Sequence, residues 1–473
     1  MRKTHLPLAG LVLLAACGDI TVPDYQNPPL DDLLTNPTVN TVKQAAVGVL
    51  QGSRQDSDTY VRWAGIVGRE GYYLDPNESR YVRQLFAGAP LGTNFTGSSY
   101  WTTPYRNIRT ANLLIQAVDQ VALSDAEKAA IKGFAKTIQA VDFIQVNNTR
   151  ELIPVQVNTP LTDITTPPPI VANRAESWAF ISSLLDEGLT QLNAAGNIAL
   201  PFPTPSGLNQ FGFNTTGKFA QFNRALKARV EVIRATEFGQ ANAANYTAAL
   251  TALSQSFIST AFTISDPLGD RTPLHTGVYQ TYSGGSGDVP NTLYDPSGKT
   301  VADSALVSLA QLRPGGTKDA RLVYKTEPGP FSLVSGLGSN LRFTIYNTRP
   351  FYGSGGQSSP IPMIRNEELI LLRAEARWFT GDKPGAMADL NFIRQNSGGL
   401  APIAQPATDA AFREALLYER TYSLLFEGGH RWVDYRRFGK LADLKVRATI
   451  RTGGAASNVA TWLPLPSNET LPR

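Results

Sequence analysis

Apolar side chains recur every three or four residues over several long stretches of the chain. One stretch holds Tyr105, Ile108, Ala111, Ile115 and Val118, which share one face if the segment is helical. Such spacing predicts an amphipathic helix that buries this face and leaves the opposite face in solvent. The same spacing predicts further helices over residues 131–141, 219–233, 364–378 and 412–426. The pattern therefore indicates a mainly α fold.

Capping signals place the ends of some of these helices. Thr103 followed by Pro104 is typical of an N-cap with proline at the first helical position. Ser124 with Glu127 three residues later is a capping box. Glycine and proline within residues 381–384 separate a helix ending near Phe379 from a short helix over 385–395, which predicts a helical hairpin.

Hairpins of this kind cannot bury their single apolar stripes alone, so they must stack on one another. We therefore expect a scaffold of tetratricopeptide-like helical hairpins, although the chain has no exact 34-residue repeat. The pattern changes between residues 263 and 362, where fourteen of the forty glycines fall. That density predicts a loop-rich, irregular excursion mounted on the helical scaffold, and such loops commonly carry binding surfaces.

The N-terminus has the pattern of an exported lipoprotein. Arg2 and Lys3 precede an apolar run over residues 6–16, which is too short to span the ~30 Å core of a bilayer. Leu14-Ala15-Ala16-Cys17 then matches a lipobox, so residues 1–16 are predicted to be a signal peptide and Cys17 to be lipidated. Because Cys17 is the single cysteine, no disulfide can form once it is modified. Four prolines over residues 17–40 predict an extended, lipid-anchored tether.

Charge and composition narrow the class of ligand. The chain carries 43 Lys and Arg against 39 Asp and Glu, without a dense basic run, so nucleic acid is not an expected partner. A content of 17% charged residues suits a protein that meets uncharged, polar ligands. After the signal peptide, no stretch reaches the ~18 uncharged apolar residues of a membrane span.

The sequence contains few of the motifs that are typical of enzymes. Beyond His5, the histidines are His275 and His430, and two isolated histidines without cysteine partners make neither a zinc site nor an HExxH motif. Gly298-Lys299-Thr300 resembles the end of a P-loop, but Leu293 stands where the first glycine is needed. We therefore expect no enzyme activity, cofactor or metal. A glycosidase needs only two suitably placed carboxylates, and a purely structural surface protein also stays open as an alternative.

Two clusters combine aromatic rings with planar polar groups, as recognition of a sugar or a peptide requires. The first cluster, which also includes Phe95, is predicted to bind ligand through Tyr72, Tyr73, Asn77, Arg80, Tyr81 and Asn94. The second cluster comprises Tyr279, Tyr282 and Tyr294 in the excursion. For any one of these aromatics, pinning a loop to the scaffold is the alternative role. Trp63 and Trp101 stand in helical contexts, so we expect them in the core.

Several blocks of sequence resemble one family. They are residues 362–376 (PMIRNEELILLRAEA), 381–394, 419–420, 426–439 (FEGGHRWVDYRRFG), the closing LPLP at 463–466 with Glu469, Trp101 to Asn112, and Gly217 to Arg229. Taken in order, these blocks are similar to those of the SusD/RagB-like nutrient-uptake outer-membrane lipoproteins. Each block alone is weak, but their succession over nearly the whole mature chain is specific.

The resemblance implies a function as well as a mostly helical fold. It implies an outer-membrane lipoprotein, exposed at the cell surface, that covers a TonB-dependent transporter of the SusC-like type and delivers captured nutrients to it. The cargo of such proteins is oligosaccharide or, in some cases, peptide, and oligosaccharide is the interpretation we adopt. The resemblance also favours the first aromatic cluster, because the loop before the Trp101 helix faces ligand in this family. Gly18-Asp19 departs from a clear acidic surface-export signal.

The motif residues themselves have another expected role. Glu375, Glu419, Arg431 and Asp434 lie on or beside apolar helical stripes, where an unpaired charge is costly. We predict that they form buried or half-buried ion pairs and helix caps that fix the scaffold, with contact to ligand as the alternative. The body (41–473) is expected to divide into an N-terminal helical part (41–262), the ligand-facing excursion (263–362), a C-terminal helical part (363–440) and a closing segment (441–473).

Overall fold

The computed structural model describes residues 33, 35–75, 77–86, 95, 99–157, 168–237, 241–285, 288–329, 338–444 and 459–469. The predicted signal peptide, Cys17 and the tether as far as residue 32 lie outside this part of the chain. The last tether residues lead into helix α2 (Val39–Arg54), whose first turn is closed by a capping box between Thr38 and Thr41. The first long helix of the described chain thus begins at Val39.

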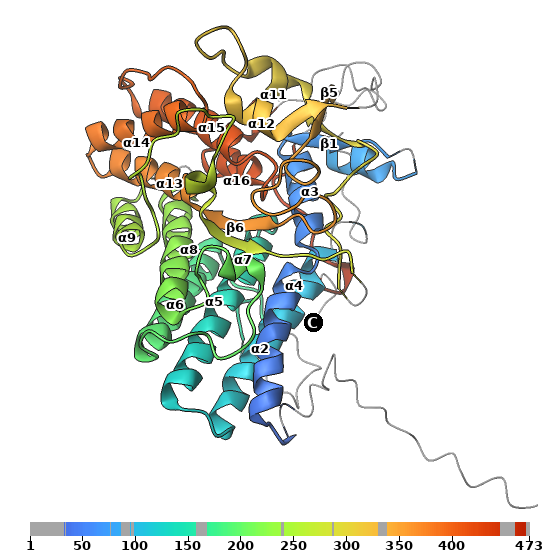
Figure 1. Ribbon diagram of the computed structural model, residues 1–473, viewed down its shortest axis with the longest axis vertical. Helices are drawn as coiled ribbons and strands as arrows, with labels where there is room; N and C mark the ends of the chain where they lie inside the picture. Colours follow the sequence, from blue (N-terminus) through green and yellow to red (C-terminus); the bar gives the residue numbers. More distant parts are fainter. Residues whose placement is uncertain are drawn as a thin grey trace, which may run out of the picture.

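Eight helices form four pairs that stack in a row, from the bottom of the molecule to its upper left in Figure 1. The pairs are α2 with α4 (Ser99–Ala117), α5 (Asp125–Thr149) with α6 (Arg174–Ala194), α8 (Thr216–Thr236) with α9 (Ala243–Ser254), and α13 (Asn366–Phe379) with α14 (Lys383–Asn396). The first helices of successive pairs, α2, α5, α8 and α13, also contact one another. This stacking confirms the mainly α fold with tetratricopeptide-like hairpins.

Local signals in the sequence account for several helix ends. Ser124 accepts a hydrogen bond from the Glu127 amide, and the Glu127 carboxylate accepts one from the Ser124 amide, so the predicted capping box starts α5. Asn173 and Thr215 cap α6 and α8 in the same way through their side chains. Each cap satisfies amides that have no partner within the first turn.

The predicted start of α4 is wrong. The helix begins at Ser99 and is interrupted at Tyr100, whose backbone (φ −108°, ψ 44°) is not helical. Pro104 would remove a hydrogen bond to the carbonyl of residue 100, but the break at Tyr100 means that no such bond is lost. Pro104 therefore lies in the first regular turn, whereas Thr103 is not the N-cap.

The upper part of the molecule combines short helices with two small sheets. The first sheet has the order β1–β3–β5–β4, and the second pairs β2 with β6. The strands are β1 (Gly71–Tyr73), β2 (Gly277–Gln280), β3 (Thr300–Asp303), β4 (Thr326–Pro328), β5 (Gly338–Phe343) and β6 (Ile361–Arg365). The helices around them are α3 (Ser57–Val67), η1 (Tyr81–Phe86), α10 (Thr272–His275), α11 (Ser304–Leu309), α12 (Ala320–Lys325), α15 (Asp409–Ser423) and α16 (His430–Arg437). Short connecting helices are η3 (Val118–Gln120), α7 (Ser206–Asn209), η5 (Leu441–Asp443) and η6 (Ser467–Glu469).

The excursion is therefore less irregular than predicted, because its strands pair across long distances in sequence. The helix expected over residues 364–378 begins at Asn366 instead. Ile364 belongs to β6, where it pairs with Val278 of β2. Ile364 is buried, as the apolar stripe predicts, but it lies in a paired strand and not in the first turn of the helix. Similarly, α15 ends at Ser423, and Phe426 lies in the following turn with a positive φ of 58°.

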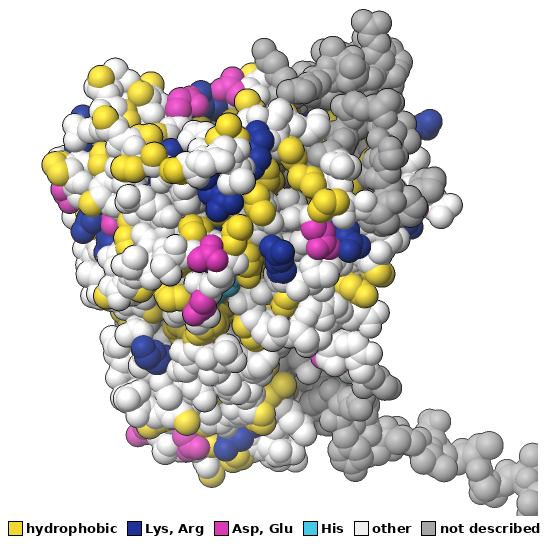
Figure 2. Space-filling model, turned by 45° about the horizontal axis from the view of Figure 1, so that its top comes forward, with side chains coloured by type: hydrophobic (Ala, Val, Ile, Leu, Met, Phe, Trp, Pro, Cys, Tyr) yellow, Lys and Arg dark blue, Asp and Glu magenta, His cyan; other side chains and the backbone are white. Residues whose placement is uncertain are grey.

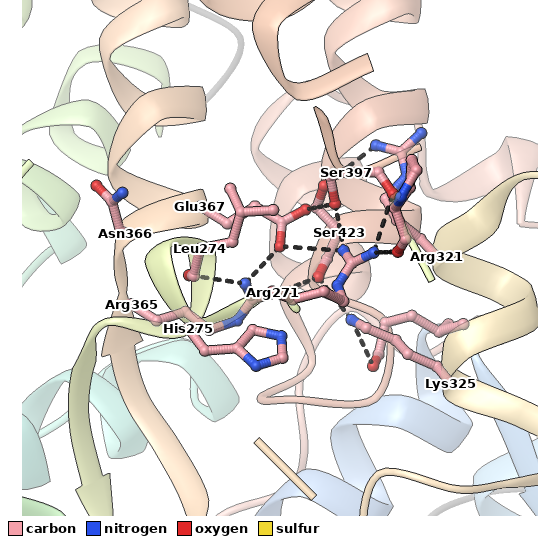
Figure 3. A network of polar contacts seen from close by, with 12 residues as sticks. Arg271, Leu274, His275, Arg321, Lys325, Arg365, Asn366, Glu367, Ser397 and Ser423 are labelled. Atoms are coloured by element: carbon pink, nitrogen blue, oxygen red, sulfur yellow. Dashed lines mark hydrogen bonds and ion pairs between the residues drawn. The ribbon is translucent and has the colours of Figure 1, made fainter. Parts of the chain in front are cut away.

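Buried ion pairs join the excursion to the C-terminal helices. Figure 3 shows Arg271, Arg321, Lys325 and Arg365 converging on carboxylates and serines in the interior. Arg321 lies 2.6 Å from Glu419, and Arg365 and Lys325 lie 2.7 and 2.5 Å from Glu427. Burial alone would raise the pKa of Glu367, but Arg365 and Arg271 hold it well below its usual range. These contacts fix the excursion on α13 and α15 through charge as well as apolar packing.

The motif carboxylates are paired as predicted, but Arg431 is not. Glu375 binds Arg437, Glu419 binds Arg321 and Arg394, and Asp434 binds Arg420 and Arg437. The Arg431 guanidinium instead donates a hydrogen bond to the carbonyl of Arg69, 2.5 Å away. The nearby carboxylate of Glu70 is occupied by two backbone amides, those of Phe426 and Arg431, at 2.6 and 3.2 Å. Among the described residues, no carboxylate thus forms the predicted ion pair with Arg431.

Residues 459–469 form a strap that contacts several helices distant in sequence. The Leu463 amide donates to the Thr149 carbonyl at the end of α5, and Trp432 of α16 donates its indole N–H to the Ala460 carbonyl, both at 2.8 Å. The Trp462 ring lies between two guanidinium groups, 4.1 Å from Arg174 and 3.7 Å from Arg436. The strap therefore joins α5, α6 and α16.

The described surface is of mixed character. Figure 2 shows Lys and Arg scattered among acidic and hydrophobic side chains over one face, which agrees with the nearly balanced charge. Within the described ranges, no helix combines the length and the apolar character that crossing a bilayer requires.

Candidate ligand-binding site

Strand pairing brings Lys299 and Thr300 of the excursion beside the first predicted aromatic cluster. β1 lies antiparallel to β3, with Tyr73 opposite Thr300. Beyond the strand, the Leu74 amide donates to the Lys299 carbonyl at 2.9 Å, and the Lys299 ammonium lies 2.8 Å from the Asp75 carboxylate. The segment that follows Tyr294 therefore forms one side of the first cluster.

Three half-buried rings form a continuous aromatic platform at this place: Tyr73, Tyr81 and Phe95. Tyr73 and Tyr81 meet edge to face with ring centroids 5.0 Å apart, and Tyr81 and Phe95 do so at 5.5 Å. Tyr81 opens the π-helical turn η1, a rare geometry that occurs often at functional sites. Behind the platform lies Trp63, 5.4 Å from Phe95 and buried as predicted.

Cationic and polar side chains frame the platform. Arg62 lies 4.9 Å from the centroid of Tyr73, and Arg80 lies 4.3 Å from that of Phe95. Arg80 also donates from Nε to the Glu78 carboxylate at 2.7 Å, which orients its exposed guanidinium. The side chain of Asn77 is exposed beside them, and its backbone amide donates to Asp75 at 3.0 Å. The frame therefore offers both donors and acceptors.

The protonation states of the frame follow from these contacts. The hydrogen bond from Lys299 holds the pKa of Asp75 below its ordinary value, so this carboxylate is ionised at neutral pH and accepts hydrogen bonds. Partial burial raises the pKa of Tyr73, whose hydroxyl thus stays protonated and donates to Asp75 at 3.2 Å. With a neutral phenol at the platform and charges only at its border, the site suits an uncharged ligand.

Three predicted ligand-binding tyrosines belong to the core instead. Tyr72, Tyr279 and Tyr282 are only 4%, 2% and 6% exposed. Their hydroxyls donate to the Asp303 carboxylate, the His275 carbonyl and the Arg54 carbonyl, respectively. Adjacent residues of a strand point to opposite faces, so β1 turns Tyr72 inward and Tyr73 outward. These three assignments are therefore corrected.

The other predicted residues have varied positions. Asn77, Arg80 and Tyr81 lie at the platform, and Tyr294 is half-buried in the neighbouring loop. Asn94 lies outside the described residues. The sequence reasoning missed Arg62, Asp75 and Lys299 as members of the frame. Lys299 stood out only as part of an incomplete P-loop pattern, and its pairing with Asp75 depends on the β1–β3 register.

Comparison with known proteins gives one match in sequence and many in structure. The model of the SusD family matches residues 339–461. No curated protein sequence matches the chain. The sequence match includes most of β5 and all of β6, α13, α14, α15 and α16, and therefore both of the longest motif blocks.

The structural matches extend over almost the whole chain. A SusD-like protein from Bacteroides fragilis superposes with a TM-score of 0.71 at 16% identity, covering 94% of this chain and 98% of its own. Surface glycan-binding protein A from Bacteroides thetaiotaomicron, solved with laminarihexaose, gives 0.65 at 14% identity over 92% and 97% of the two chains. Its counterpart from Bacteroides uniformis gives 0.67 at 14% identity over 91% and 97%. The resemblance predicted from the motifs is thus confirmed, and the likeness to these structures concerns the fold.

Proposed function

We propose that this SusD-like chain captures oligosaccharides at the outer membrane and delivers them to a TonB-dependent transporter of the SusC-like type. The observation that carries the proposal is the aromatic platform of Tyr73, Tyr81 and Phe95 with its polar frame. A protein of the same fold was solved with laminarihexaose, which supports a glycan as the ligand.

The platform has the two properties that sugar recognition needs. Aromatic rings cover the apolar faces of pyranose rings, whereas planar polar groups such as Asn77 and Arg80 bind hydroxyls. Each net hydrogen bond contributes only ~0.5–1.5 kcal/mol, because the sugar loses bonds to water when it binds. A modest affinity also suits a protein that must release its cargo. We expect a dissociation constant between about micromolar and millimolar, or roughly −4 to −8 kcal/mol.

The rest of the proposal concerns location and partner. Lipidation at Cys17 would hold the protein at the outer membrane, and the helical row would leave the platform free while another face contacts the transporter. In this role the protein binds and releases its cargo without changing it chemically. The chain then acts as a binding protein and not as an enzyme.

The test compares glycan binding by the wild type and by a variant without the platform. Tyr73→Ala, Tyr81→Ala and Phe95→Ala would be combined and titrated calorimetrically with laminarihexaose and a panel of other oligosaccharides and peptides. We expect the variant to lose glycan binding while it still co-purifies with the transporter. The matched control is Phe180→Ala on α6, a half-buried ring that packs edge to face on Phe143 far from the platform.

Three results would count against the proposal. Equal glycan affinity of the wild type and the triple variant would move the site away from the platform. Binding of peptides but of no glycan would replace the proposed cargo. A wild type that co-purifies with no barrel protein would contradict the delivery step, whatever it binds.

A further inference from the structure

A second cavity lies apart from the aromatic platform, where the helical row meets the excursion. Its volume is about 310 Å³, and it opens between α2 on one side and α7 with β2 on the other. Figure 1 shows α2 rising from the lower part of the molecule toward α7 and β6, the strand that pairs with β2. Ten of the seventeen lining residues are apolar, among them Val47, Leu50, Leu208, Phe222, Val278 and Met363.

One end of this cavity is polar but carries no net charge. Arg54 of α2 pairs with the carboxylate of Asp288 and also donates to the carbonyl of Thr281. Gln280 donates its side-chain amide to the Ser53 carbonyl at 2.9 Å, and Gln51 is exposed beside it. The charge of each member of the ion pair is therefore already satisfied by the other.

The residues that line the cavity determine which class of ligand it can accommodate. A sugar would leave its hydroxyls without partners against Val47, Leu50 and Val278, and each buried, unpaired hydroxyl costs free energy. An apolar cavity of about 150 Å³ accommodates benzene, so 310 Å³ has room for roughly twelve non-hydrogen atoms. Met363 has an unbranched, flexible side chain that can adapt to an elongated body.

The polar end restricts the head group of such a ligand. A carboxylate would lie beside Asp288, and an ammonium group would lie beside Arg54, so either charge would compete with the existing ion pair. A hydroxyl or an amide can instead donate to Asp288 or accept from Gln51 without separating the pair. We propose that this cavity binds an uncharged amphiphile with an unbranched apolar chain of about ten carbons and a hydroxyl or amide head. This inference does not depend on the proposed function of the aromatic platform.

The experiment uses 1-decanol as the probe and decanoate as its charged counterpart, both below the concentration at which they aggregate. Calorimetry and thermal unfolding would be measured on the full chain. We expect 1-decanol to bind the wild type with saturation and to raise its melting temperature, because a ligand that binds only the folded state stabilises it. Decanoate should bind at least tenfold more weakly.

Variants that fill the cavity locate the binding. Val47→Phe and Leu50→Trp enlarge side chains in the α2 wall, and both should weaken 1-decanol binding at least tenfold. Gln44→Phe, three residues earlier on α2 and outside the cavity, is the matched control and should bind like the wild type. The platform variant should also bind 1-decanol normally, which separates the two sites.

Three outcomes would overturn the inference. If the wild type shows no saturable binding, the cavity does not accept this class of ligand. If both filled variants fold and bind 1-decanol as the wild type does, the alcohol binds elsewhere. If decanoate binds as tightly as 1-decanol, the assignment of an uncharged head group is wrong.

Discussion

Two buried ionisable residues differ in whether a group of opposite charge lies beside them. Arg437 lies between two carboxylates, 2.5 Å from Glu375 and 2.9 Å from Asp434. Asp142, which is 1% exposed, has no cation within ion-pair distance in the part of the chain that the structure describes. Its carboxylate accepts a hydrogen bond from the Asn107 amide at 2.7 Å, and burial raises its pKa to about 7. Arg437 and its two carboxylates stabilise one another, whereas an ionised Asp142 would lack a cationic partner among the described residues.

Removing Arg437 should destabilise the protein more than removing Arg431 from the same helix. Arg437→Met leaves two buried carboxylates without this partner, and we expect a loss of about 3–5 kcal/mol in the free energy of unfolding. Arg431→Met removes a hydrogen bond to the Arg69 carbonyl and should cost about 1–2 kcal/mol. Urea unfolding of both variants measures the difference. Equal losses would show that the ion pairs of Arg437 contribute no more than the single hydrogen bond of Arg431 does.

Asp142 should make the stability depend on pH. Its pKa is higher in the folded state than in the unfolded chain, so the folded state binds the proton more tightly. The stabilisation from this proton is fully present below about pH 4 and is lost as the pH rises to about 7. Asp142→Asn should therefore gain stability relative to the wild type over this range, by at most about 4 kcal/mol. A constant difference between the two proteins from pH 4 to 8 would contradict this.

The limits of sequence reasoning are clear at single residues. Tyr72 and Tyr73 are chemically identical neighbours, and only the pairing of β1 with β3 decides which of them faces outward. Burial of Glu375, Glu419 and Asp434 could be predicted, because an apolar helical stripe reveals the interior. The contact of Arg431 could not be predicted, because its partner is a backbone carbonyl in a distant turn.

Whole elements were predictable where their signals are local. The capping box at Ser124 uses residues three positions apart, and the structure confirms it. The start of α13 was misplaced because Ile364 pairs with Val278, which is far away in sequence and leaves no periodic signal. The same reason applies to the sheet that forms the edge of the aromatic platform.

The position of strand β1 can be tested at a glycine. A Cβ at Gly71 would lie 2.7 Å from both the Phe343 ring and the Val301 carbonyl, so Gly71→Ala must displace β1 from β3 and β5. We expect reduced stability together with weaker ligand binding, because Tyr73 follows on the same strand. Gly48→Ala is the control: nothing lies within 4 Å of its Cβ inside α2, and it should gain about 0.5–1 kcal/mol. Calorimetric titration and thermal unfolding of both variants would show whether β1 positions the platform. Unchanged binding by Gly71→Ala would separate the platform from this strand.

On the scale of the molecule, a regular row of helices supports an irregular body through buried charge. The stacking of hairpins was predictable, since each amphipathic stripe needs a neighbour. The attachment of the excursion was not, since Arg271 before α10 and Arg321 and Lys325 on the short helix α12 find their partners only after folding. The aromatic platform and the second cavity both form at the junction of these two parts.

The proposed anchor can be tested without disturbing the fold. Cys17→Ala should release the protein into the soluble fraction with an unchanged melting temperature, because acyl chains attach through buried methylene groups in the bilayer. Fractionation in a strain without the transporter measures this. Co-sedimentation of the variant with outer membranes in that strain would refute lipidation at Cys17.

The strap of residues 459–469 has a consequence for the order in which the newly made chain can complete its structure. The Thr149 carbonyl at the end of α5 receives its partner, the Leu463 amide, only after the residues between them have been synthesised. Trp462 likewise fills the space between Arg174 and Arg436 at the last stage. Closing so long a loop is costly in entropy until the intervening helices are in place. We therefore expect the polypeptide to remain incompletely closed during synthesis and to lock only once residues 459–469 have been made.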